Sequence, residues 1–190
     1  QGRIEIITNS VLTSDNFMAQ SIIDMDMAPR LLLSPEIEKA WLAASESNQL
    51  PVDLLQSKSW KQLINNPRIL IYQTGRLDAA ILGQGDKEYG KLHAKFIAGD
   101  LIGFVGTTNF DYRSRLFNNE MGFFYQNDAL NKDLIDIFEF LKSTSYRWGS
   151  PEWLEMRRQL MRVGGMKGWS TRQQRGIFKF LRITGIDWLI

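Results

Sequence analysis

His93 and Lys95, two residues apart, are the side chains of this sequence whose types and spacing best suit chemistry on an anion. In an extended strand, alternate side chains share a face, so this imidazole and this ammonium are expected to point to the same side. A neutral imidazole nitrogen is a nucleophile, and a fixed cation stabilises negative charge that develops during attack. The pair therefore favours attack on a phosphodiester through a covalent phosphohistidine.

Further polar groups follow along the chain. The turn Gly106-Thr107-Thr108-Asn109 would bring hydroxyl, amide and backbone donors toward the same spot. Asn109 would then stabilise charge on the phosphoryl oxygens, and Thr107 would add a phosphate contact. Glu120 is expected to accept the second ring N–H of His93 and so fix its tautomer. The predicted catalytic residues are His93, Lys95, Asn109 and Glu120.

Short strands are expected to position these residues. Leu92–Ala98 and Leu101–Val105 are apolar runs separated by Gly99-Asp100. This pattern is typical of a hairpin, because such a turn needs residues that tolerate positive φ. Asp100 then lies in the turn, so its predicted role is structural. Glu120–Tyr125 predicts a further strand.

The rest of the chain alternates strands and helices. Arg3–Thr8 and Arg68–Gln73 read as strands, the second of them buried. A capping serine and a first-turn proline predict a helix from Pro35 to about Glu46. Lys132–Tyr146 has apolar residues at helical spacing. Together these elements predict the α/β class, a sandwich with a mixed central sheet flanked by helices.

The composition excludes several classes of site. Of the 190 residues, 44% are apolar and 23% charged, which is ordinary for one globular domain. The absence of cysteine and the single histidine exclude disulfides and a histidine-rich zinc site within one copy, and we expect neither a metal nor a cofactor. No apolar run reaches the roughly 20 residues of a membrane span. Gly83–Gly90 lacks the Lys-Ser/Thr ending of a phosphate-binding loop.

Charge divides the chain into two parts. Residues 1–146 hold 14 Lys/Arg against 18 Asp/Glu, whereas residues 147–190 hold 9 against 3. We therefore predict a main domain over 1–146 and a basic, tryptophan-rich C-terminal appendage over 147–190. The tryptophans of the appendage suit either packing or a membrane–water interface; they are Trp148, Trp153, Trp169 and Trp188.

Ser170–Arg182 predicts a basic amphipathic helix within the appendage, with Ile177, Phe178 and Leu181 on its apolar face. Such a helix suits an anionic membrane surface or an acidic partner, and an ordinary packed terminal helix fits the pattern as well. Its cations are Arg172, Arg175, Lys179 and Arg182.

The spacing H-x-K-x4-D from His93 to Asp100, followed by G-T-x-N and then an acid, resembles the HKD motif of the phospholipase D superfamily. In this comparison Asp100 and Gly106 are structural motif residues. The runs NFDYRSR (109–115) and NEMG (119–122), with segments near both ends, resemble the C-terminal half of bacterial cardiolipin synthase-like proteins. One residue fewer separates Asp100 from Gly106 than is usual there, so we expect a rebuilt hairpin turn.

The resemblance implies a phospholipase D-like sandwich in which two such motifs share one site. One histidine is then the nucleophile, and the other protonates the leaving group. The second half would be either an upstream part of a longer chain or a second copy in a homodimer. The start without methionine and the likeness to a second half favour the longer chain.

The function we expect from these residues is phosphatidyl transfer or phospholipid hydrolysis, without a metal, by a protein in the cytoplasm that binds peripherally at the inner membrane. An HKD-family endonuclease would use the same site, but the net charge of −4 over residues 1–146 argues against nucleic acid. A non-catalytic membrane or assembly module, its site spoiled by the shorter hairpin, is the third reading.

Overall fold

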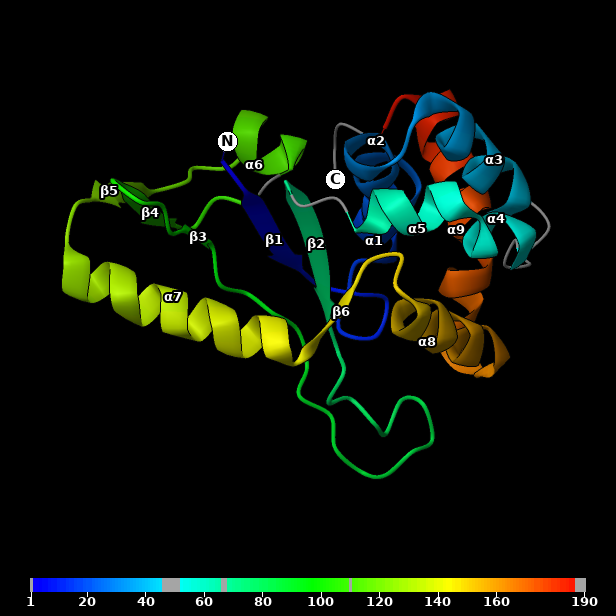
Figure 1. The fold of residues 1–190 in the computed structure, drawn as a ribbon. Coiled ribbons are helices and arrows are strands. Elements are labelled where there is room, and N and C mark those ends of the chain that lie inside the picture. The colour runs from blue at the N-terminus through cyan, green and yellow to red at the C-terminus, as the bar shows by residue number, and fades with distance from the viewer. Residues whose placement is uncertain (1, 46–51, 66–67, 110, 187–190) are drawn as a thin grey trace.

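The computed structural model describes residues 2–45, 52–65, 68–109 and 111–186, and has mixed α and β structure (Figure 1). The first sheet consists of β1 (Ile4–Thr8), β2 (Ile69–Thr74) and β6 (Ser145–Arg147), in the order β1-β2-β6. β1 runs parallel to β2, and β6 runs antiparallel to it. The predicted strands at 3–8 and 68–73 are thus confirmed within a residue.

The strands expected to carry the site form a second, separate sheet. It consists of β3 (Phe96–Ile97), β4 (Gly103–Gly106) and β5 (Gly122–Tyr125), all antiparallel. The expected hairpin forms, but its first strand is shorter than predicted and begins after Lys95. The single central sheet expected from the sequence is therefore wrong for the described residues, which place these strands in two small sheets.

A side chain explains where the two sheets part. Asn9, just after β1, accepts a hydrogen bond from the N–H of Leu92 at 2.8 Å and donates one to its carbonyl at 2.9 Å. These are the backbone groups that a neighbouring strand would otherwise pair. The Asn9 amide therefore takes the place of a strand at this point.

The helices pack mostly on one side of the first sheet (Figure 1). A π-helical segment, η1, joins the first two of them. The elements are α1 (Phe17–Ile22), η1 (Ile23–Met27), α2 (Ala28–Leu32), α3 (Pro35–Ser45), α4 (Val52–Gln56), α5 (Lys58–Ile64), α6 (Tyr112–Leu116), α7 (Asp128–Ser143), α8 (Pro151–Arg162) and α9 (Gly165–Thr184).

Local capping sets several helix boundaries. α3 begins at Pro35 as predicted. α7 begins at Asp128, four residues before the expected start, because the side chain of Asn127 accepts the N–H of Leu130 and caps the helix there. α9 ends where Gly185 adopts φ +66°, a conformation that glycine adopts without strain.

Four tryptophans form the centre of the core. Trp41, Trp60, Trp148 and Trp153 are each at most 1% exposed, and their ring centroids lie 5.0 to 6.1 Å apart. The packing interpretation is therefore right for Trp148 and Trp153. Trp169 differs, with 45% of its surface exposed. Trp188 lies outside the described residues.

The basic C-terminal segment packs against the N-terminal helices. α9 lies along α1 and η1, and α8 packs on α9 and β6 (Figure 1). The boundary predicted between residues 146 and 147 falls inside β6. No helix within the described residues is long and apolar enough to cross a membrane.

Gly103→Ala is expected to lower the unfolding free energy by about 1–3 kcal/mol, because overpacking strains a filled site. Gly103 is buried in β4, and a Cβ there would lie 2.0 Å from Cζ of Tyr125. Tyr125 also donates to Asn131 of α7 at 3.1 Å, so the displaced ring would lose a link between sheet and helix. Urea denaturation measures the change.

Gly176→Ala is the matched control for this substitution. Gly176 is exposed in the middle of α9, and a Cβ there meets nothing closer than 3.7 Å. Alanine should stabilise this helix by about 0.5–1 kcal/mol. Effects of the same sign at both positions would contradict the packing argument for Gly103.

Candidate functional site

His93 and Lys95 lie in the segment that leads into β3. The carbonyl of Lys95 accepts the N–H of Gly106 at 3.1 Å, which extends the pairing of β3 with β4 by one residue. Lys95 Nζ donates to the carbonyl of His93 at 2.8 Å. The His93 side chain is exposed and that of Lys95 is partly buried. Since Asn9 fixes the backbone of Leu92, the residue before the nucleophile candidate is anchored to the end of β1.

Glu120 is held by two donors just before β5. Thr107 Oγ1 donates to one carboxylate oxygen at 2.6 Å, and Asn118 Nδ2 donates to the other at 3.0 Å. These hydrogen bonds, the one from Thr107 first, lower the pKa of Glu120 below its ordinary value, and the charge of Lys95 adds to the effect. Glu120 is therefore an ionised, oriented carboxylate close to Lys95.

The expected hydrogen bond between Glu120 and the imidazole of His93 is not formed. Both residues lie in the described part of the chain, where the oxygens of Glu120 are taken by Thr107 and Asn118. Thr107, predicted as a phosphate contact, here orients Glu120 instead. The role of Glu120 as the residue that fixes the His93 tautomer stays a prediction.

Asn109 lies in the loop that leads to α6. Its side chain is exposed, and its backbone N–H donates to Ser114 Oγ at 3.3 Å. Ser114 is 3% exposed and lies within 3.5 Å of Asn118 Nδ2. Asp111 caps α6 by accepting the N–H of Ser114 at 2.7 Å. One buried serine thus connects Asn109 to Asn118 and, through it, to Glu120.

Ser114 and Asn118 are site residues that the sequence reasoning did not single out. Both fall inside or beside the runs NFDYRSR and NEMG, which were noted only as a resemblance. The sequence signal that could have found them is Asp111, a cap-type residue three positions before Ser114, which indicates a helix start in this loop. Asp100, expected to be structural, is exposed in the turn between β3 and β4.

Gly106 and Gly122 leave room for an aromatic ring beside the candidate site. A Cβ at Gly106 would lie 2.7 Å from Cζ of Phe104, and one at Gly122 would lie 2.3 Å from the same atom. Gly106 is the cross-strand neighbour of Gly122 and pairs with Lys95 on its other side. The Phe104 ring therefore lies on the sheet face that carries Lys95, since cross-strand neighbours share a face.

The surface around these residues is apolar and open. Phe124 stacks on Phe104 with ring centroids 5.1 Å apart, yet 72% of its own surface is exposed. Neighbouring residues of the second sheet and α6 are also large, apolar and at least 49% exposed; they are Ile97, Leu101, Ile102, Leu116, Phe117, Met121 and Phe123. By strand alternation Ile97 and Phe124 lie on the face that carries Lys95, and Phe123 lies on the opposite face. Exposed apolar side chains gathered on one face mark an interaction site. The candidate site therefore lies on a surface that lacks an opposing wall.

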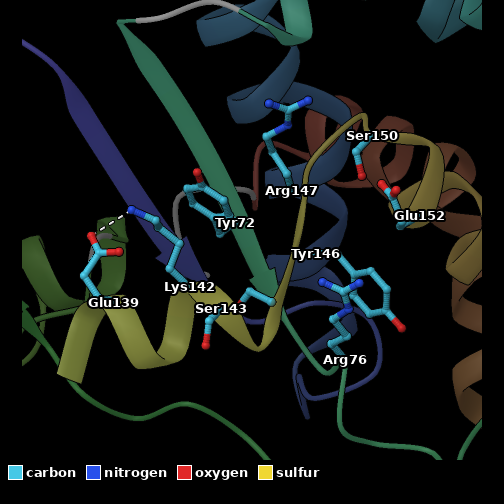
Figure 2. A pocket seen from close by; sticks show the side chains of 10 residues that line it. Tyr72, Arg76, Glu139, Lys142, Ser143, Tyr146, Arg147, Ser150 and Glu152 are labelled. Carbon is cyan, nitrogen blue, oxygen red and sulfur yellow. Dashed lines mark hydrogen bonds and ion pairs between the residues drawn. The ribbon is translucent and has the colours of Figure 1, made fainter. Parts of the chain in front are cut away.

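A cleft of about 400 Å³ lies elsewhere, between β2, β6 and the start of α8 (Figure 2). Lys142 contacts Glu139, one turn earlier on α7, at 2.7 Å and also contacts Glu5 of β1 at 3.1 Å. Arg147 donates to Asn65 at 3.0 Å, and burial raises the pKa of Tyr146 at the other end. Acids balance the cations of this cleft, and no predicted catalytic residue lines it.

No family model and no solved structure matches the chain. One similar curated protein is an uncharacterized protein of Streptococcus mutans serotype c (strain ATCC 700610 / UA159), 36% identical over 124 residues. The match covers 62% of this chain and 26% of the relative. The chain therefore spans about a quarter of the length of the relative it matches.

Proposed function

We propose that this chain is one half of a phosphodiester-processing site of the phospholipase D type, with His93 as the nucleophile. The observation that carries the proposal is that Lys95 links the other two residues: its Nζ donates to the backbone carbonyl of His93, whose imidazole is exposed, and its charge acts on the oriented Glu120 carboxylate. The HKD spacing of the sequence supports a phospholipase D-like half-domain. Cardiolipin synthase-like phosphatidyl transfer is the activity that the sequence resemblance favours.

The reaction proceeds in two balanced steps. A ring nitrogen of His93 attacks phosphorus, the N–P bond forms, and the P–O bond to the leaving alcohol breaks while an acid from the second half protonates that oxygen. Water or a lipid hydroxyl then attacks phosphorus and breaks the N–P bond, and the same group of the second half takes its proton. Lys95 and Asn109 stabilise charge on the phosphoryl oxygens, so no metal is required.

The second half docks on the apolar surface of the second sheet and α6. Ile97 and Phe124 are 49% and 72% exposed there, on the face of the sheet that carries Lys95. Burying such a surface favours association, and the same contact would give the site its missing wall. The remaining part of a longer polypeptide or a second copy of this chain would supply that half.

A phosphodiester with a good leaving group tests His93 without the second half. The probe is bis(4-nitrophenyl) phosphate, because nitrophenolate departs without protonation. We expect a burst of one nitrophenolate per chain, a mass increase of one nitrophenyl phosphate, and an acid-labile adduct on His93. EDTA should leave the burst unchanged, since Lys95 and Asn109 are the groups proposed to stabilise the developing charge.

Two outcomes would overturn the proposal. The first is a burst with no modification of His93, and the second is a burst abolished by EDTA and restored by a divalent metal. Absence of any adduct at saturating probe would favour the non-catalytic reading instead.

A further inference from the structure

The apolar face predicted for the C-terminal helix is turned into the protein. Phe178 is 8% exposed and Leu181 is fully buried, and both pack toward the core that contains α1 and η1. Phe178 and Leu181 are therefore not available to a membrane surface. Of the cations of the same helix, Lys179 and Arg182 are exposed, and Arg172 and Arg175 are partly buried.

A second apolar stripe of α9 is exposed to solvent. Its large side chains are between 45% and 84% exposed; they are Met166, Trp169, Phe180 and Ile183. At 3.6 residues per turn these positions lie along one side of the helix, with Gly176 between them. Trp169 also contacts Phe17 edge to face at 6.0 Å, which holds the indole at the border between protein and solvent.

The cations form a row beside this stripe. Arg172, Arg175, Lys179 and Arg182 recur at intervals of three and four residues, so they occupy one adjacent strip of the helix surface. Arg172 donates to the carbonyl of Met161 at 2.6 Å, which fixes its guanidinium at the end of α8. The guanidiniums of Arg175 and Arg182 lie 5.7 and 6.0 Å from the centroid of the Phe178 ring.

No acidic residue occurs in the sequence between Glu155 and Asp187, so the strip has no carboxylate of its own segment. A helix with exposed Trp, Phe and Ile beside a row of cations has the composition of an interfacial helix that lies on an anionic bilayer. The apolar stripe would enter the acyl boundary, and the arginine and lysine heads would remain among the lipid phosphates.

We propose that the outer face of α9, formed by the stripe Met166, Trp169, Phe180 and Ile183 and the adjacent cations, docks this chain on an anionic lipid surface. Charge complementarity selects this occupant over a neutral protein surface. The exposed aliphatic side chains Met166 and Ile183 select it over nucleic acid, because they offer no ring on which a base stacks. The proposal stands without the chemistry assigned to His93. α9 lies at the far side of the molecule from α7 (Figure 1).

Vesicle sedimentation of the full chain tests the docking face. We expect binding to vesicles of phosphatidylcholine and phosphatidylglycerol in equal amounts, and little binding to phosphatidylcholine alone. Replacing Lys179 and Arg182 by glutamine should weaken binding about 25-fold, at about fivefold for each cation near the surface. The same change at Lys58 and Lys61, two exposed lysines of α5, should weaken it less than about threefold.

Insertion of the apolar stripe is tested separately. Phe180→Ser with Ile183→Ser should reduce vesicle binding at least about tenfold. Because the chain has no cysteine, Ile183→Cys can carry an environment-sensitive dye. Its emission should shift to the blue on anionic vesicles, whereas a dye at Asp133→Cys on α7 should not respond.

Four results would overturn the proposal. Equal binding to both vesicle types, or equal losses for the α9 and α5 variants, would remove the role of the cationic row. Binding to a short DNA duplex that needs the cations but not Phe180 and Ile183 would assign the face to nucleic acid. A dimer lost on changing Phe180 and Ile183, without vesicle binding, would assign it to a second copy. His93→Ala should leave vesicle binding unchanged, which separates this result from a failure of the catalytic proposal.

Discussion

Replacing His93 by alanine is expected to abolish the nitrophenolate burst and to lower turnover of a labelled phospholipid by about 10⁴-fold or more, as loss of a catalytic nucleophile does. The imidazole is exposed, so the substitution creates no cavity and should leave thermal unfolding unchanged. Burst amplitude, product formation and circular dichroism together measure these effects. Labelled lipid product formed at the wild-type rate by the variant would contradict the assignment.

Two lysines in the same segment supply the matched control. Lys95 contacts the carbonyl of His93, whereas Lys91, four residues earlier, forms an exposed ion pair with Asp15. Lys95→Ala should slow adduct formation by about 10² to 10³-fold, the range for one lost charge-stabilising donor. Lys91→Ala should change it little. Parallel assays with single-stranded and duplex DNA decide between lipid and nucleic-acid phosphodiesters.

The strands could be predicted where apolar runs are long and bounded. β2 occupies a buried apolar run, and its predicted and observed ranges differ by one residue at each end. The division into two sheets could not be predicted in the same way. It depends on Asn9, whose side-chain amide forms hydrogen bonds with the backbone of Leu92, 83 residues away. A local sequence pattern does not predict such a pairing.

The candidate site shows the same division between local and long-range information. The two apolar runs predicted the hairpin but not its register, since a two-residue turn at Gly99-Asp100 would pair Lys95 with Phe104, whereas the structure pairs Lys95 with Gly106. The hydrogen-bond partners of Glu120 were not foreseen. Thr107 and Asn118 donate to it from a loop whose conformation depends on the buried hydroxyl of Ser114.

For α9 the helix was predicted and the packed orientation was one of the two alternatives, but the exposed second apolar stripe was not foreseen. A helix with two apolar stripes can bury either of them, and only the packing partners decide which one. Here α1 and η1 cover the stripe that contains Phe178 and leave Phe180 exposed. The acidic residue that anchors this packing is Asp24, within the π-helical turn of η1.

Asp24 is the centre of a buried polar network that joins four elements. It is fully buried, and its carboxylate accepts hydrogen bonds from Arg157 of α8 at 3.0 Å, Gln174 of α9 at 2.8 Å and Gln73 of β2 at 2.8 Å. The Arg157 guanidinium also lies 4.9 Å from the ring centroid of Trp153. Burial lowers the pKa of Arg157, while the charge of Asp24 opposes that shift.

Arg157→Met is expected to lower the unfolding free energy by about 3–5 kcal/mol, because it leaves the Asp24 carboxylate buried without its counter-charge. The two remaining amide donors satisfy hydrogen bonds but supply no positive charge. Chemical denaturation at neutral pH measures the loss. The exposed pair Lys132 and Asp136 of α7 is the matched control, and Lys132→Met should leave the unfolding free energy nearly unchanged.

A double variant separates the charge from the packing. Asp24→Leu combined with Arg157→Met removes both charges, so it should recover part of the stability that Arg157→Met loses alone. A double variant less stable than the sum of the two single changes would show that hydrogen bonds to Gln73 and Gln174, rather than the ion pair, dominate this site.

Since the same network fixes α9 against η1, Arg157→Met should also weaken vesicle binding by the native cationic row, whereas Lys132→Met should not.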